Sequence, residues 1–152
     1  MKKHNVLFTG FLSSVLFSSM LFADVIAPED VKVENLQVAQ PLADAGDPVA
    51  GRKTFSDRKL GNCLACHANS DQADQLFHGE VGPTLDGVGG RWSEGQLRAI
   101  VVNAKSVFTE LTVMPAFYSL DVGENVRKDL EGKTILTAQQ VEDVIAYLAT
   151  LK

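Results

Sequence analysis

The feature that most constrains this chain is a single short run, Cys63-Leu64-Ala65-Cys66-His67. Its cysteines are the only two in the 152 residues. Cys-x-x-Cys-His is the attachment signature of c-type haem, because two thiols at this spacing can each add to a vinyl group of the porphyrin while the adjacent imidazole lies under the iron. The run therefore predicts one covalent haem c, bound through Cys63 and Cys66, with His67 as an axial ligand of the iron.

Three other uses of the same residues fit the sequence less well. A redox-active Cys-x-x-Cys pair is expected beside a βαβ pattern, and the sequence contains no such pattern. A structural zinc site needs four Cys or His ligands, usually as two knuckles, and the second knuckle is missing. A plain disulfide leaves His67 without a role. Covalent haem is the interpretation that uses every residue of the motif.

A haem iron bound by His67 has a second axial position, for which Met114 and His78 are the candidates in the mature chain. Met114 is followed by Pro115, which stiffens the loop, and it lies far enough along the chain to return over the opposite haem face. His78 lies in a polar, acidic loop, where a solvated histidine is the simpler interpretation. We therefore predict Met114 as the second ligand. An iron with both positions filled is suited to electron transfer and has no open position for a substrate.

The N-terminus predicts export. Lys2, Lys3 and His4 precede an uncharged stretch at positions 6–22 that is rich in Val, Leu and Phe, and Ala23 stands at its end. This is the pattern of a cleaved signal peptide over residues 1–23, although an uncleaved membrane anchor is the alternative. We expect a periplasmic protein with no membrane segment after cleavage. Cleavage would leave 12 Lys and Arg against 19 Asp and Glu, so the net charge changes from -5 to -7. Such an acidic chain is a poor ligand for nucleic acid.

Periodicity in the rest of the chain predicts an all-α domain, with three to five helices and long loops around the haem. Residues 24–45 have no sustained period and form an extended leader that either wraps a surface or is loose. Residues 46–152 form the domain. Within it we expect helices from 48 to about 59, from 93 to 105, and from 138 to the C-terminus, the last two opening on capping boxes. The glycine-rich segment 61–90 is expected to be loop.

Beyond the haem motif, the residues resemble class I cytochromes c. A helix with Gly51 and Phe55 precedes the motif, and the C-terminal helix has the run Val144-Ile145-Ala146-Tyr147-Leu148. In that family these two helices cross. The run 82–87 also resembles the family loop in which a proline carbonyl accepts the ring proton of the haem histidine, which implies that Pro83 orients His67.

A narrower resemblance is carried jointly by the runs 61–67, 82–89, 91–94, 113–118 and 132–143, which are similar to the SoxX family. SoxX is the monohaem subunit of the SoxAX cytochrome. The resemblance implies a periplasmic heterodimer with a SoxA-like subunit, in which thiosulfate is joined oxidatively to a cysteine of a SoxYZ-like carrier protein. This chain would be the electron-transfer subunit of an L-cysteine S-thiosulfotransferase, with no catalytic residue of its own. It would pass electrons to a soluble acceptor cytochrome.

Two further interpretations are open at this point. Arg91 and Trp92 are candidates for contacts with the haem propionates, because guanidinium and indole N–H groups are donors, although an ordinary surface arginine beside a core tryptophan would look the same. The alternative function is a stand-alone soluble electron shuttle. Segment 118–136 favours the subunit, because a minimal shuttle does not need it and its Val122, Val126 and Leu130 have no obvious internal partner.

Overall fold

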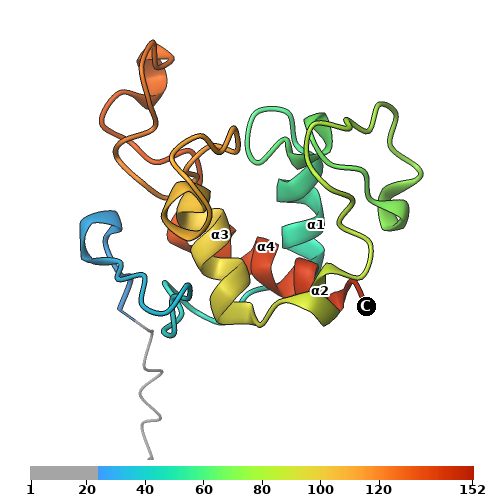
Figure 1. Ribbon diagram of the computed structural model, residues 1–152, viewed down its shortest axis with the longest axis horizontal. Helices are drawn as coiled ribbons and strands as arrows, with labels where there is room; N and C mark the ends of the chain where they lie inside the picture. Colours follow the sequence, from blue (N-terminus) through green and yellow to red (C-terminus); the bar gives the residue numbers. More distant parts are fainter. Residues whose placement is uncertain (1–23) are drawn as a thin grey trace, which may run out of the picture.

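Residues 24–152, described by a computed structural model, fold as α-helices joined by long loops (Figure 1). The α-helices are α1 (Pro48–Ser56), α2 (Val88–Arg91), α3 (Glu94–Val107) and α4 (Ala138–Thr150). Single 3₁₀ turns lie at Pro28–Asp30, Cys63–Ala65, Ser70–Gln72 and Lys128–Leu130. No strand forms within the described residues, so the expected all-α class is confirmed. The predicted signal peptide, residues 1–23, lies outside them. No helix in residues 24–152 has the length and apolar character needed to span a membrane.

The centre of the molecule is the crossing of α1 and α4 (Figure 1). Gly51 makes this crossing possible, because a Cβ at that position would lie 1.9 Å from the backbone oxygen of Asp143. Phe55, one turn further along α1, packs edge-on against Tyr147 with 5.5 Å between the ring centroids. The glycine therefore brings the two backbones into contact, and the aromatic pair fills the space beside it.

The starts of α3 and α4 follow the predicted capping signals, whereas α1 ends earlier than expected. Ser93 with Gln96 and Thr137 with Gln140 form complete capping boxes. Helix α1 ends at Ser56 instead of continuing to about residue 59, because Asp57 is extended and its carbonyl accepts from the backbone N–H groups of Leu60 and Asn62. This turn directs the chain into the haem motif.

Helix α2 was not expected, because its sequence Val-Gly-Gly-Arg has a weak helix propensity. Tertiary contact explains it. The Gly89 N–H donates to the Leu151 carbonyl at 2.8 Å, and a Cβ on Gly89 would lie 2.6 Å from the Ala149 oxygen. The docking of this segment against the end of α4 therefore compensates for its weak local preference.

The leader wraps the domain. Val38 and Leu42 are buried, and Leu42 donates its N–H to Glu142 on α4 at 2.9 Å. Glu142 also forms a buried bidentate pair with Arg98 on α3, at 2.7 and 2.8 Å, and Arg98 donates to the Val38 carbonyl at 3.0 Å. At the start of the leader, Tyr118 donates to the Ile26 carbonyl at 2.7 Å. Leader, α3 and α4 thus share one buried polar centre.

Candidate haem site

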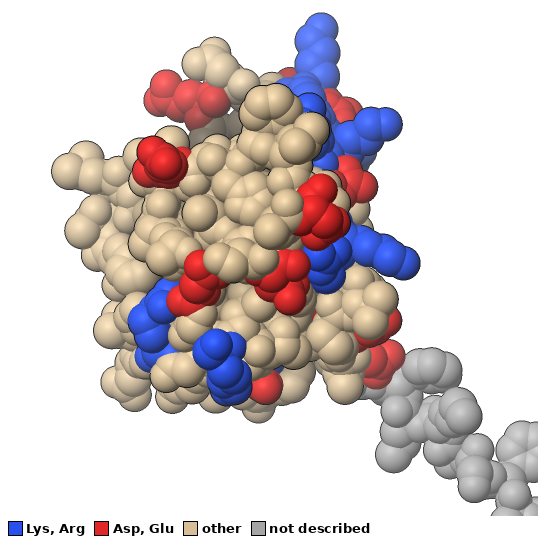
Figure 2. Space-filling model, turned by 90° about the vertical axis from the view of Figure 1, so that its right-hand side faces the viewer, with Lys and Arg blue, Asp and Glu red and all other residues tan. Residues whose placement is uncertain are grey.

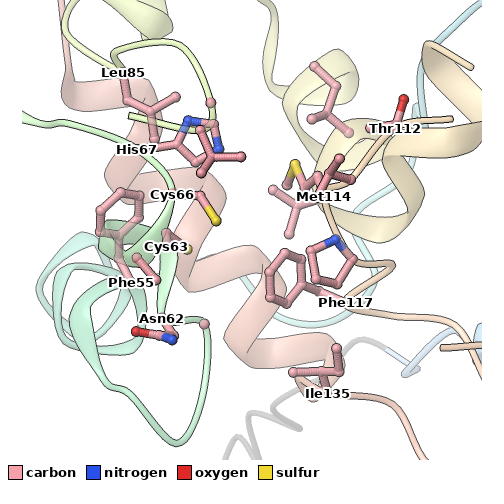
Figure 3. A pocket seen from close by; sticks show the side chains of 18 of the residues that line it. Phe55, Asn62, Cys63, Cys66, His67, Leu85, Thr112, Met114, Phe117 and Ile135 are labelled. Carbon is pink, nitrogen blue, oxygen red and sulfur yellow. The ribbon is translucent and has the colours of Figure 1, made fainter. Parts of the chain in front are cut away.

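A cavity of about 980 Å³ lies between the Cys-x-x-Cys-His segment and the loop that contains Met114. Its volume is near the upper end of the range for cofactor sites, about 300–1,000 Å³. Figure 3 shows His67, Cys63 and Cys66 on one side of this space and Met114 on the other, with its sulfur facing the cavity. The lining is mostly apolar, so most of the surface of a group that filled the cavity would contact apolar side chains.

The cysteine side of the cavity is a tight turn. Asn62 has a left-handed conformation, with φ 47°, and starts the 3₁₀ turn Cys63–Ala65. The His67 N–H donates to the Cys63 carbonyl at 2.9 Å, which closes the motif into one compact unit. Cys63 and Cys66 are not joined in a disulfide, so both sulfurs are available for thioether bonds. Burial raises the pKa of the Cys63 thiol to about 12.

The His67 ring is held in one orientation. Its Nδ1 lies 2.7 Å from the Pro83 carbonyl oxygen, which can only accept, so Nδ1 carries the proton. The Nε2 lone pair is therefore available to a metal. Position 82 requires glycine, because a Cβ there would lie 2.3 Å from His67 Cε1 and would clash with the ring. The Gly82 N–H donates to the Cys66 carbonyl at 2.8 Å, which binds the proline loop to the haem motif.

The Met114 side is built from a loop anchored at both ends. Before the methionine, the Lys105 ammonium donates to the Thr112 carbonyl. After it, the Phe117 N–H donates to the Val101 carbonyl of α3 at 3.2 Å. These bonds position Met114, which packs against the core while it lines the cavity.

The other residues singled out from the sequence lie as follows. Arg91 lines the cavity, but its guanidinium donates to the backbone carbonyls of Asp86 at 2.6 Å and Thr84 at 3.1 Å. Trp92 also lines the cavity and packs edge-on against Phe108. Their contact with propionates stays a prediction. His78 is not among the lining residues, because both of its ring nitrogens bond to the backbone of its own loop.

Segment 118–136 needs one correction. Leu130, expected to have no internal partner, lines the cavity, and Val122 and Val126 are each half-buried. The segment projects from the body near the Met114 side, as the orange loop of Figure 1. It therefore supplies part of the cavity wall, which its apolar spacing alone did not indicate.

Sequence reasoning missed that the charged groups around the cavity are all of one sign. Among the described residues that line it, the charged ones are Arg58, Lys59, Arg91 and Arg127, with no Asp or Glu. In a chain with an excess of acidic residues, this is a local reversal of charge. The adjacent Arg58 and Lys59 just before the motif were the available signal. Cations around an apolar cavity favour a ligand with carboxylate groups.

Sequence reasoning also missed a polar cluster next to His67. The Tyr147 hydroxyl on α4 donates to Asp71 at 2.7 Å and accepts from the side-chain amides of Asn69 and Gln72, at 2.9 and 3.1 Å. Burial and the neighbouring Asp71 raise the pKa of Tyr147 to about 12. The cluster fixes the chain immediately after His67 onto the C-terminal helix.

The residues of the cavity fit a covalent haem. Two thiols, an imidazole with a free Nε2 and a thioether face one apolar space, with cations at its edge for the propionates. By contrast, no group of three or more His, Cys, Asp or Glu side chains that could hold a metal ion occurs in residues 24–152.

The profile of the cytochrome c family matches residues 48–152. The chain belongs to the cytochrome c family. Membership implies a covalent haem c, and Cys63 and Cys66 occupy the positions of its Cys-x-x-Cys-His motif. No match was found among the curated proteins compared with this sequence.

Among solved structures, this cytochrome is similar to a chain in the crystal structure of SoxXA from P. pantotrophus. The two are 42% identical in sequence, with a TM-score of 0.78. The match covers 85% of the present chain and 99% of the other. At this identity and coverage, the resemblance to SoxX seen in the sequence is confirmed.

Proposed function

We propose that this cytochrome is the electron-accepting monohaem subunit of a periplasmic SoxAX-type heterodimer. The observation that carries the proposal is the pair of opposed donors in one apolar cavity, His67 on one wall and Met114 on the other. If both residues ligate the haem iron, no coordination position is left for a substrate. The site is therefore suited to holding an electron and not to transforming a bound molecule.

Each part of the site has a physical task in this role. When bound, haem supplies a one-electron ferric/ferrous couple. Cys63 and Cys66 would hold it through thioether bonds, and the Pro83 carbonyl keeps the His67 proton on Nδ1. A neutral thioether from Met114 favours the ferrous state more than a second imidazole would, so the reduction potential is raised. The mostly apolar lining would also favour the less charged, reduced state of the bound group.

The reaction that would supply the electrons is the joining of thiosulfate to a carrier cysteine. A new S–S bond forms between the cysteine sulfur and thiosulfate, the thiol proton is released, and two electrons leave. The partner subunit would host this step, and this chain would take the electrons one at a time. A soluble cytochrome acceptor must then oxidise it between transfers. The two-protein composition of the solved SoxXA relative supports a heterodimeric partner of the SoxA type.

The ligand assignment can be tested with Met114→Ala in the haem-loaded protein. We expect loss of the weak sulfur-to-iron charge-transfer band at the red end of the visible spectrum and a lower reduction potential. Leu111→Ala is the matched control and should keep both, because Leu111 lies three residues earlier in the same loop, is 90% exposed and does not line the cavity. If the band persists in Met114→Ala, Met114 is not the ligand.

The subunit assignment is tested by mixing the haem-loaded chain with its cognate dihaem partner. We expect one heterodimer peak in size-exclusion chromatography at micromolar concentration, and reduction of this haem when thiosulfate and carrier are added. Separate elution of the two proteins would favour the stand-alone shuttle.

N-terminal sequencing of the exported protein, with Asp24 expected first, tests the signal peptide.

A further inference from the structure

An exposed apolar pair lies at the tip of the loop that follows the haem motif. Leu76 and Phe77 are 77% and 81% exposed. Phe77 also has a left-handed backbone, with φ 66°, which is unfavourable for any residue with a Cβ and rare for a bulky one. The chain thus maintains two unfavourable features in one place, a solvated aromatic ring and a strained backbone. Such a combination points to a function outside folding.

This pair is held out by a rigid frame. On one side, Asn69 and Gln72 are buried and bonded to the Tyr147 hydroxyl. On the other, His78 Nε2 donates to the Gln72 carbonyl at 3.1 Å, and its Nδ1 accepts from the Asn69 N–H at 3.3 Å. Because both ends of the tip are fixed, Leu76 and Phe77 are presented in a set direction with little ordering entropy to lose on binding.

The frame places the pair next to the haem attachment turn. Gly79 donates its N–H to the Leu64 carbonyl at 2.7 Å, and a Cβ on Gly79 would lie 2.1 Å from the Ala65 oxygen, between the two cysteines. Neither Leu76 nor Phe77 lines the cavity, so haem does not cover them. Val81, further along the same loop, does line it. The loop therefore carries exposed apolar side chains at its tip and again at the edge of the cofactor site.

We propose that Leu76 and Phe77 form an anchor for the second cytochrome subunit of the heterodimer, with Phe77 inserted into an apolar pocket of that partner. This inference rests on the proposed function. A protein seated on the anchor lies against the turn that holds the haem, where electrons must cross, and rigid aromatic anchors of this kind contribute most to binding. The loop is at the right of Figure 1, and Figure 2 looks onto that side, where uncharged surface is bordered by acidic and basic side chains. An apolar centre with a charged rim is usual in protein interfaces, and Leu76 and Phe77 supply the exposed apolar side chains of this loop.

The two side chains are an anchor and not a whole interface. An aromatic side chain buries about 150–250 Å², whereas a stable interface needs about 800 Å² from each partner. The partner must therefore also contact neighbouring surface, and loss of Phe77 should weaken the complex without abolishing it. A second copy of this chain is the competing occupant, and it is an outcome of the experiment below.

Phe77→Gly distinguishes an effect on binding from an effect on folding, because glycine adopts φ near 66° without steric strain. The haem-loaded variant should melt at or above the wild-type temperature, yet bind the cognate dihaem subunit at least tenfold more weakly by calorimetry. Leu36→Gly is the matched control, because Leu36 is also exposed and has φ 62°. It should bind like the wild type.

The outcomes are distinct. Equal affinities of Phe77→Gly and wild type overturn the anchor while leaving the heterodimer intact. Failure of the wild type to bind the dihaem subunit overturns the proposed function, and the anchor with it. A wild-type homodimer in sedimentation that Phe77→Gly converts to monomer also overturns the proposal, because it assigns the pair to self-association.

Discussion

Replacing Gly51 by alanine has two opposite effects on stability: the helix propensity of alanine stabilises α1, and the added methyl group destabilises its packing against α4. In a solvated helix the change stabilises by about 1 kcal/mol, because alanine loses less backbone entropy than glycine. In this structure the new Cβ would lie 1.9 Å from the Asp143 oxygen, 2.5 Å from its carbonyl carbon and 2.9 Å from Tyr147 Cβ. Real Cβ contacts essentially never fall below 3.0 Å. A backbone carbonyl cannot move aside by changing rotamer, so α1 and α4 must separate.

The magnitude follows from these two terms. Forcing extra methyl groups into a packed interior costs about 1–3 kcal/mol, and contact with backbone places this case at the upper end. Subtracting the propensity gain of about 1 kcal/mol leaves a net destabilisation of about 2 kcal/mol. For a domain of this size, about 4 °C is lost per kcal/mol. We therefore expect Gly51→Ala to lower the melting temperature by about 8 °C.

The assay is thermal unfolding of the haem-loaded protein followed by circular dichroism. Gly90→Ala is the control, because its Cβ would meet nothing within 4 Å and its backbone is not left-handed. We expect this control to melt at or above the wild-type temperature. A Gly51→Ala protein that melted at or above the wild type would refute the direct contact of the two helix backbones.

Two further perturbations follow from the buried polar groups. Arg98→Met leaves the Glu142 carboxylate buried without its cation, and should lower the free energy of unfolding by about 3–5 kcal/mol in urea titration. Arg52→Met, which breaks an exposed pair with Asp74 away from the cavity, should cost no more than about 1 kcal/mol. The pKa of Tyr147, about 12, is above the ordinary value of 10.0, so its stabilising contribution is complete below pH 10 and is lost as the pH rises toward 12. Wild-type stability should therefore fall across that range in denaturant titrations, and Tyr147→Phe should have a lower but flatter profile. Burial also raises the pKa of Tyr118, so Tyr118→Phe should flatten the profile in the same direction but less than Tyr147→Phe does. Equal slopes for wild type and Tyr147→Phe would contradict the linkage.

The elements that could be predicted from sequence were those with local causes. The capping boxes at Ser93 and Thr137 fixed the starts of two helices because each satisfies its own N–H groups within three residues. The haem motif was recognisable because its chemistry requires a fixed spacing. Met114 could be singled out because it is the one methionine after residue 23, and it lines the cavity, although its role as a ligand stays a prediction.

What escaped prediction depends on residues far apart in the chain. Arg98 looks like the exposed residue of an amphipathic helix, and only its pairing with Glu142, 44 positions later, explains its burial. Helix α3 is kinked at Asn103, with φ -157° and ψ 96°, and no glycine or proline at this position predicts the kink. The path of the leader depends on the hydrogen bond from the Leu42 N–H to the same glutamate, and no local sequence pattern predicts that bond.

Glu142 also bears on how fast the molecule folds. Leu42 and Glu142 are separated by 100 positions, and the bond of Asn69 to Tyr147 spans 78. Helical proteins usually fold quickly because their contacts are local, and the rate falls as the mean sequence separation of contacts rises. This chain joins its first described segment, its middle and its last helix in one buried centre. Although its secondary structure is entirely helical, its native topology must be reached by closing long loops. Its folding should therefore be slower than that of a helical bundle of equal length.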